Sequence, residues 1–300
     1  MSIPQMPRRR FLETAALGAA GAAFLEQSTV RQALAGETLN AAGDRASSAA
    51  QPVRLGVASY SLRKFPRDKA IEMTKTLGVR FINLKDVHLA VDLSPTDLAV
   101  ARHEIEAAGL QIVGGGTITF GKDTDDDVRR YFEYAKGAGM PLIVGTADAA
   151  ILPRVERFAK QYDIKVAIHN HGPEDKHFAS PYDVLKEVRT MDPRMGLCMD
   201  IGHTSRTGTD IVKAAADAGA RLLDIHAKDL RDAKVKESQC VVGEGVLPIV
   251  ELFRQLQRMN YAGYVNLEYE IDADDPLPGM QRSFSYMRGV LAGLGAPAVR

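Results

Sequence analysis

Eight segments of the chain carry strand patterns, and a helix pattern follows each of them between residue 53 and residue 294. Parallel strands need long crossover connections, which helices supply, so this alternation predicts a parallel sheet covered by helices. The expected strands are 53–60, 80–87, 111–118, 141–146, 165–169, 195–201, 222–227 and 264–269. Eight such units in one chain predict an α/β fold of the (β/α)8 TIM barrel type, as a single domain.

The helix patterns begin and end at recognisable signals. Ser94-Pro95 and Ser180-Pro181 each place a capping serine before a proline at the first helical position. The alternative fold is an open doubly wound sheet, but no Gly-x-Gly-x-x-Gly motif follows the first strand. The expected helices are 66–77, 95–108, 125–138, 152–162, 181–190, 209–218, 249–259 and 279–294.

The segment before the first strand has the composition of an export signal. Arg8-Arg9-Arg10-Phe11-Leu12 matches the twin-arginine pattern, an Ala- and Gly-rich apolar stretch follows, and Ala33-Leu34-Ala35 is a small-x-small cleavage site. The apolar stretch is too short and too rich in glycine to span a membrane. We therefore expect a cleavable twin-arginine signal peptide over residues 1–35, a linker over 36–52, a barrel over 53–300 and export to the periplasm.

The charge balance favours a small-molecule partner. Thirty-eight Lys and Arg residues match 38 Asp and Glu residues, and tryptophan is absent. A chain without excess positive charge or stacking aromatics is a poor candidate for nucleic-acid binding. Two cysteines exclude a disulfide scaffold. The sequence leaves the oligomeric state open, with a homo-oligomer as one option.

Polar residues gather late in the last four strands. Successive side chains of a strand point to opposite faces, and the apolar face of a barrel strand packs against the helices. The residues of inward parity near the ends of strands five to eight are His169, Asp200, His226 and Glu268. The carboxyl ends of parallel barrel strands meet at one mouth, so these side chains should converge there. Two imidazoles and two carboxylates suit Mn²⁺, Co²⁺, Zn²⁺ or Fe²⁺, which predicts one divalent metal site.

Three blocks resemble the motifs of the xylose isomerase-like TIM-barrel superfamily. They are Met199-Asp200-Ile201-Gly202-His203, Asp224-Ile225-His226-Ala227-Lys228-Asp229 and Asn266-Leu267-Glu268-Tyr269-Glu270. The superfamily includes sugar phosphate isomerases and epimerases, ketose 3-epimerases, inosose dehydratases and endonuclease IV. The resemblance covers residues 53 to about 295. It implies a divalent metal held by one side chain from each of strands five to eight, among them Asp200, His226 and Glu268.

Strand five departs from the pattern of the ketose epimerases. Those enzymes have a glutamate there that binds the metal and also acts as an acid/base, whereas this chain has His169-Asn170-His171. Parity places His169 at the glutamate position, but His171 shares that parity. One of the two usual carboxylate bases is therefore missing. The strand-five ends of inosose-dehydratase-like members are also rich in histidine, which favours proton abstraction with loss of water.

The chemistry common to these relatives is metal-assisted enolisation, in which a base removes the proton next to a polarised carbonyl. Glu268, beside the metal, is the first candidate for this base, and Lys85 on strand two is the second. His203 resembles the superfamily's substrate-binding histidine. The residues expected to contact substrate are His203, Lys228, His171, Arg63 and His88.

We therefore expect a metal-dependent sugar isomerase or epimerase that acts by enolisation of a ketose or keto-sugar. The alternative is a metal-dependent lyase or hydratase acting on a keto-sugar or an inosose. A second alternative is a non-catalytic sugar-binding protein. DNA repair of the endonuclease IV kind would need more metal ligands and a basic groove, which this sequence does not offer.

Overall fold

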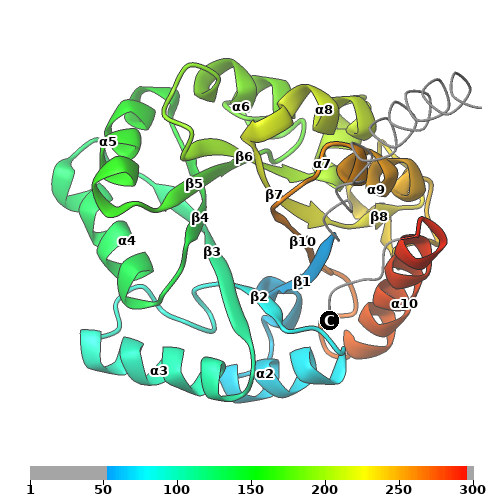
Figure 1. Cartoon of the computed structure of the whole chain (residues 1–300), viewed down its shortest axis with the longest axis horizontal. Coiled ribbons are helices and arrows are strands. Elements are labelled where there is room, and N and C mark those ends of the chain that lie inside the picture. The colour runs from blue at the N-terminus through cyan, green and yellow to red at the C-terminus, as the bar shows by residue number, and fades with distance from the viewer. Residues whose placement is uncertain (1–52, 296–300) are drawn as a thin grey trace, which may run out of the picture. The chain divides into compact units, whose positions relative to one another are not determined.

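Eight parallel strands close into a ring in the structure, a computed structural model that describes residues 53–295. The order around the ring is β1-β10-β7-β6-β5-β4-β3-β2, which confirms the predicted (β/α)8 barrel (Figure 1). The signal peptide and linker predicted over 1–35 and 36–52 lie outside the described residues and stay predictions. The barrel strands are β1 (Arg54–Ala58), β2 (Phe81–Leu84), β3 (Gln111–Phe120), β4 (Leu142–Ala147), β5 (Lys165–His169), β6 (Met195–Asp200), β7 (Leu222–Ala227) and β10 (Tyr264–Leu267).

Helices surround the ring of strands, as Figure 1 shows. The serine caps form as expected: Ser94 accepts a hydrogen bond from the Asp97 amide, and Ser180 forms a reciprocal capping box with Asp183. Between residues 53 and 295, no helix is both long enough and apolar enough to cross a bilayer. The main helices are α2 (Arg67–Thr76), α3 (Pro95–Ala107), α4 (Asp125–Gly137), α5 (Leu152–Tyr162), α6 (Pro181–Val188), α8 (Ile211–Ala218), α9 (Ile249–Arg258) and α10 (Leu277–Gly293).

The interior of the barrel is filled by side chains and is not a channel. Asp224 on β7 accepts hydrogen bonds from the side-chain amides of Asn266, at 2.8 Å, and Asn83, at 3.3 Å. Burial raises the pKa of Asp224 to about 7. A Cβ atom at Gly56 would lie 2.3 Å from Asn266 Oδ1, so only glycine at this position of β1 leaves room for the amide. This polar layer supports the residues at the carboxyl ends of the strands.

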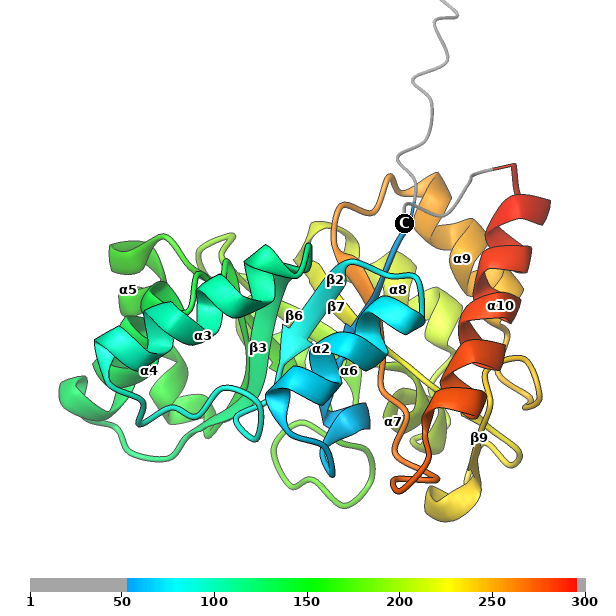
Figure 2. The same cartoon turned by 90° about the horizontal axis from the view of Figure 1, so that it is seen from below.

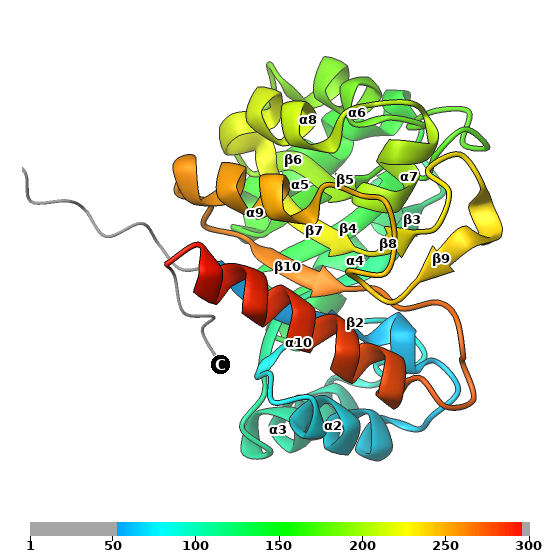
Figure 3. The same cartoon turned by 90° about the vertical axis from the view of Figure 1, so that its right-hand side faces the viewer.

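Short elements that the sequence pattern did not predict lie at the carboxyl ends of the strands. Helix α7 (Ile201–Arg206) follows β6 directly, and η1 (Ser59–Leu62) follows β1. Strands β8 (Asp229–Leu230) and β9 (Gln239–Cys240) form a small antiparallel pair. Figure 2 shows α7 and β9 at the same end of the barrel, and Figure 3 shows β9 beyond the tip of β10.

Asp229 holds the chain that leads from this pair to α9. Its two carboxylate oxygens accept hydrogen bonds from the amides of Leu230, Gly243, Gly245 and Leu247, at 2.9 to 3.2 Å. A Cβ atom at Gly245 would lie 2.2 Å from Asp229 Oδ1, which explains why glycine is required there. Because Asp229 is only 1% exposed, it fixes the loop by buried, charge-assisted bonds.

Replacing Asp229 with Asn should lower the free energy of unfolding by about 2 to 4 kcal/mol, because an amide nitrogen would face backbone donors. Urea denaturation measures this change. The matched control is Asp232→Asn in the connection between β8 and β9, where an exposed carboxylate accepts one bond, from the Lys234 amide. A loss below about 0.5 kcal/mol for Asp229→Asn would show that the four bonds do not hold the loop.

Candidate functional site

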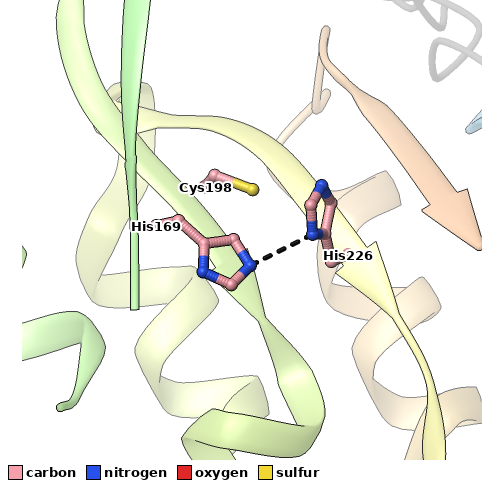
Figure 4. Close-up of side chains that lie close together, drawn as sticks. All are labelled: His169, Cys198 and His226. Atoms are coloured by element: carbon pink, nitrogen blue, oxygen red, sulfur yellow. Dashed lines mark hydrogen bonds between the residues drawn. The ribbon is translucent and has the colours of Figure 1, made fainter. Parts of the chain in front are cut away.

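The four predicted metal ligands converge at the carboxyl ends of β5, β6, β7 and β10. His169 Nε2 lies 3.1 Å from His226 Nδ1 and 3.7 Å from Asp200 Oδ2. Glu268 Oε2 lies 3.2 Å from His226 Nδ1. One possible ligand atom of each residue lies within 4.8 Å of those of the other three. Figure 4 shows the facing nitrogens of His169 and His226. The alternation of side chains along the strands therefore correctly predicted that these four residues lie close together.

The donor set fits a divalent cation. Ligand atoms about 2.1 Å from one ion lie about 3 to 4 Å from each other, which is close to the distances in this cluster. Asp200 Oδ2 is buried and accepts no hydrogen bond, although the Lys228 ammonium lies 2.9 Å away, and buried carboxylate oxygens usually accept one. Burial lowers the pKa of His169 well below its ordinary value. Its imidazole is therefore neutral, the form that binds metals.

Cys198 lies beside the two histidines, as Figure 4 shows, and with them forms a second group of possible ligands. It is fully buried in β6, and burial raises the pKa of its thiol to about 12. Only the thiolate is a strong metal ligand, so a protonated Cys198 is a poorer donor than the nearby carboxylates. The cluster of His169, Asp200, His226 and Glu268 is therefore the better candidate for a metal centre.

Lys228 is packed into the cluster. Its ammonium nitrogen donates a hydrogen bond to Glu270 Oε2 at 2.6 Å, and it lies 2.9 Å from Asp200 Oδ2 and 3.0 Å from Glu268 Oε2. A Cβ atom at Gly202 would lie 2.7 Å from the Lys228 stem, which therefore needs glycine beside it. Burial alone would lower the pKa of Lys228, but the three carboxylates raise it well above its ordinary value. The group is therefore charged.

The predicted contact of Lys228 with substrate stays a prediction, but the structure indicates a further role for this residue. The side chain is only 4% exposed, and its ammonium points at carboxylates of the cluster. Three carboxylates and one ammonium carry a formal charge of −2, which a divalent cation would balance. Lys228 thus neutralises part of the negative charge of the cluster.

A polar pocket of about 310 Å³ adjoins the cluster, a size that suits a small molecule. It lies where the carboxyl ends of the strands meet, which is the usual place for the active site of a TIM barrel. Its lining residues are Tyr60, Lys85, Thr117, Thr119, Thr146, His169, His171, His203, Glu268 and Glu270.

Three residues predicted to serve as base or substrate contacts lie on the wall of this pocket. Lys85 Nζ donates a hydrogen bond to the Thr117 carbonyl at 3.2 Å. His203 Nδ1 accepts a hydrogen bond from Arg206 at 3.2 Å, which orients its ring. His171 also lines the pocket. Their positions are compatible with the roles predicted for them.

The structure distinguishes the two histidines of strand five. His169 lies within the four-residue cluster, whereas His171 is outside that group: its ring lies 4.3 Å from the ring of His169, and its Nδ1 lies 3.3 Å from Asp175 Oδ2. Asn170, of opposite parity, accepts a hydrogen bond from the Asp200 amide at 3.0 Å. It thereby fixes β5 against the end of β6. His169 is therefore the better candidate for the fourth ligand.

Two predicted substrate contacts lie off the pocket wall. His88 is 2% exposed, and its ring bonds to Ser59 Oγ at 2.9 Å and to backbone carbonyls near η1. Arg63 donates to the backbone carbonyls of Tyr60, at 3.2 Å, and Glu270, at 2.7 Å. Both side chains bond to loops of the protein in this structure, and their contact with substrate stays a prediction.

Sequence reasoning did not single out Glu270 or the neutral residues of the pocket. Glu270 shares the parity of Glu268 and lines the same pocket, so its parity was a usable signal. Tyr60 and the threonines carried none, because such residues are common on any strand end. Half of the residues that line the pocket could therefore be identified only from the structure.

This chain has a closed (β/α)8 barrel with a polar pocket at the carboxyl ends of its strands. TIM-barrel enzymes carry their active sites at this end of the barrel. The family model described as xylose isomerase-like TIM barrel matches residues 71–290. The chain belongs to this family.

Similar proteins include epimerases and dehydratases. An inosose dehydratase of Mesomycoplasma hyopneumoniae (strain 7448) is 26% identical over 160 residues, or 47% of this chain and 53% of that protein. The chain thus spans about half the length of this curated relative. An inosose dehydratase of Glaesserella parasuis serovar 5 is 23% identical over 241 residues, or 64% of this chain and 78% of that protein. The structure of an L-ribulose 3-epimerase shares the fold, with a TM-score of 0.66 and 14% identity over 80% of this chain and 95% of that one.

Proposed function

We propose that this protein is a divalent-metal-dependent enzyme that enolises a polyhydroxylated ketone, with keto-sugars and inososes as its substrate class. The observation that carries the proposal is the convergence of His169, Asp200, His226 and Glu268 beside a polar pocket. Bound there, a divalent cation would supply Lewis-acid polarisation of a carbonyl. The pocket walls offer hydroxyl, imidazole and carboxylate groups, which suit a substrate rich in hydroxyls.

Glu268 is the first candidate for the base, because it belongs to the cluster and also lines the pocket. Burial alone would raise the pKa of Glu268, but His226 and Lys228 lower it well below its ordinary value. Its carboxylate is therefore ionised at neutral pH and can accept a proton. A carboxylate of low pKa is a weak base, so the substrate proton must be acidified by the polarised carbonyl beside it.

Loss of water is the outcome that the site favours after proton abstraction. Epimerisation needs proton transfer on two faces of a carbon, and the strand-five position that supplies a second glutamate in ketose epimerases is His169 here. His171 and His203 line the pocket and can donate a proton to a departing hydroxyl. The curated relatives described above are inosose dehydratases. We therefore propose a dehydratase acting on a keto-sugar or an inosose.

Epimerisation is the second candidate, favoured by one observation. Lys85, directly after β2, lines the same pocket as Glu268, and its ammonium group is held there by a hydrogen bond to the Thr117 carbonyl. An amine at this position could complete a pair of bases. The fold shared with the L-ribulose 3-epimerase structure is compatible with this outcome as well.

One experiment separates these outcomes. The protein is loaded with Mn²⁺ or Co²⁺ and incubated in D₂O with inosose, D-fructose, D-tagatose and L-ribulose, and the products are analysed by mass spectrometry and NMR. We expect a product that has lost one water. Deuterium incorporation without loss of water would favour epimerisation. Binding of a sugar without either change would favour the non-catalytic alternative.

A further inference from the structure

We propose that Glu270 is a substrate-binding residue that holds a hydroxyl group of the ligand and so selects polyhydroxylated ketones. This proposal rests on the substrate class of the proposed function, and it names the Glu270 carboxylate as the group that recognises that class. Glu270 is not one of the four candidate ligands, so the role proposed for it is distinct from theirs.

Glu270 presents a carboxylate to the pocket next to the metal cluster. It lies two residues beyond Glu268 with the same parity, and both residues line the pocket. Lys228 Nζ lies 2.6 Å from Glu270 Oε2 and 3.0 Å from Glu268 Oε2, so one ammonium holds both side chains on the same side of the pocket. The Glu270 side chain is 39% exposed, which leaves carboxylate surface for a ligand.

Side chains from two other elements fix the backbone of this segment, although the ladder of β10 ends at Leu267. Gln239, on β9, donates to the Glu268 carbonyl at 2.7 Å and accepts from the Glu270 amide at 3.1 Å. Ser61, in η1, accepts from the Tyr269 amide at 2.8 Å and donates to the Leu267 carbonyl at 3.1 Å.

Arg63 completes this arrangement by donating to the Glu270 carbonyl at 2.7 Å. Beyond the Glu268 amide, which still bonds to the Ala227 carbonyl at 2.9 Å, these three side chains therefore take the place of a neighbour strand for residues 269–270. An ordinary surface loop needs no such support, whereas a binding residue gains affinity when its position is fixed before the ligand arrives. The support falls on both sides of Glu270, at its amide and at its carbonyl.

Chemistry identifies the ligand group. An ionised carboxylate accepts hydrogen bonds only, so it pairs with hydroxyl donors and repels phosphates and carboxylates. The fixed position beside Glu268 places the recognised hydroxyl close to the reacting part of the ligand. A ketone without a hydroxyl there would leave the carboxylate unpaired, and sites that bind a substrate hydroxyl reject analogues that lack it.

The test uses the full chain loaded with Mn²⁺ and a non-reacting polyol, myo-inositol, as the probe in titration calorimetry. We expect Glu270→Ala to weaken myo-inositol binding by about 10- to 100-fold, the range for a hydrogen bond to a charged group. We also expect the variant to bind Mn²⁺ with unchanged stoichiometry. Asp274→Ala is the matched control, because this acid is 86% exposed in the same loop and pairs with Lys64.

A second probe tests the hydroxyl directly. Among monodeoxyinositols, one isomer should bind the unaltered protein more weakly than myo-inositol does, and Glu270→Ala should bind the two equally. Equal affinity of Glu270→Ala and the unaltered protein for myo-inositol would overturn the inference, and so would loss of Mn²⁺ from the variant or an absence of measurable polyol binding by the unaltered protein. Glu270-dependent polyol binding by a protein that converts no ketone would instead overturn the proposed function alone.

Discussion

Replacing Asp200 with Asn should abolish tight binding of Mn²⁺ or Co²⁺ and reduce turnover by about 10³-fold or more, the loss expected when Lewis-acid stabilisation worth several kcal/mol is removed. Asn is the sharpest substitution because Asp200 has two separate tasks. Its Oδ1 caps α7 by accepting the His203 amide at 2.8 Å, and an amide oxygen can keep that bond. Its Oδ2, a buried oxygen that pairs with the Lys228 ammonium at 2.9 Å without a hydrogen bond, becomes a nitrogen.

The matched control is Asp210→Asn. Asp210 caps α8 by accepting the amides of Val212 and Lys213, at 2.8 and 3.0 Å, and it is absent from the pocket wall. Both variants therefore change a capping carboxylate to an amide, but only one changes the cluster. Elemental analysis after dialysis, and circular dichroism to check folding, measure the result. If Asp200→Asn retained one equivalent of Mn²⁺ with unchanged affinity, the metal centre would lie elsewhere.

Replacing Lys228 with Met should lower the free energy of unfolding of the metal-free protein by about 3 to 5 kcal/mol, the usual cost of removing one partner of a buried ion pair. The three carboxylates of Asp200, Glu268 and Glu270 would then lie together without a counter-charge. Met keeps most of the volume of the lysine stem against Gly202, so packing changes little.

Metal should reverse part of this loss. A cation that binds only the folded state adds stability, about 2.7 kcal/mol at 100 times its Kd, and it should bind the more negative cluster of the variant more tightly. We therefore expect Mn²⁺ to raise the Tm of Lys228→Met more than that of the unaltered protein. Calorimetry in EDTA and in Mn²⁺ measures both, with Lys234→Met as the exposed control. An equal rise in Tm for the two proteins would contradict the charge argument.

The barrel and its cluster could be predicted because each depends on regular geometry. Apolar runs marked the strands, and alternation along β5, β6, β7 and β10 gave the face on which His169, Asp200, His226 and Glu268 lie. Ring closure then brings the ends of neighbouring strands together. These steps need only the period of a strand and the parallel direction of the sheet.

Positions beyond a strand end could not be predicted in this way. His88 follows a turn after β2, in which its amide bonds to the Lys85 carbonyl, and the chain carries the ring inward to Ser59. Lys228 has the parity of a pocket residue, but its long side chain reaches carboxylates of two neighbouring strand ends. Gln239 lies in a segment without a strand pattern, and its bonds to Glu268 and Glu270 depend on contacts distant in sequence.

The pairing of β10 with both β1 and β7 makes the assembly of the candidate site depend on closure of the barrel. Leu267 lies opposite Val57 of the first strand and Ala227 of β7, so β10 closes the ring between two strands that are distant in sequence. Glu268 and Glu270 follow that strand directly. A partly folded barrel that still lacks β10 would hold three of the four ligands but neither carboxylate of the pocket wall. Contacts that span more than 200 residues form late in folding, which keeps reactive groups apart in incomplete chains.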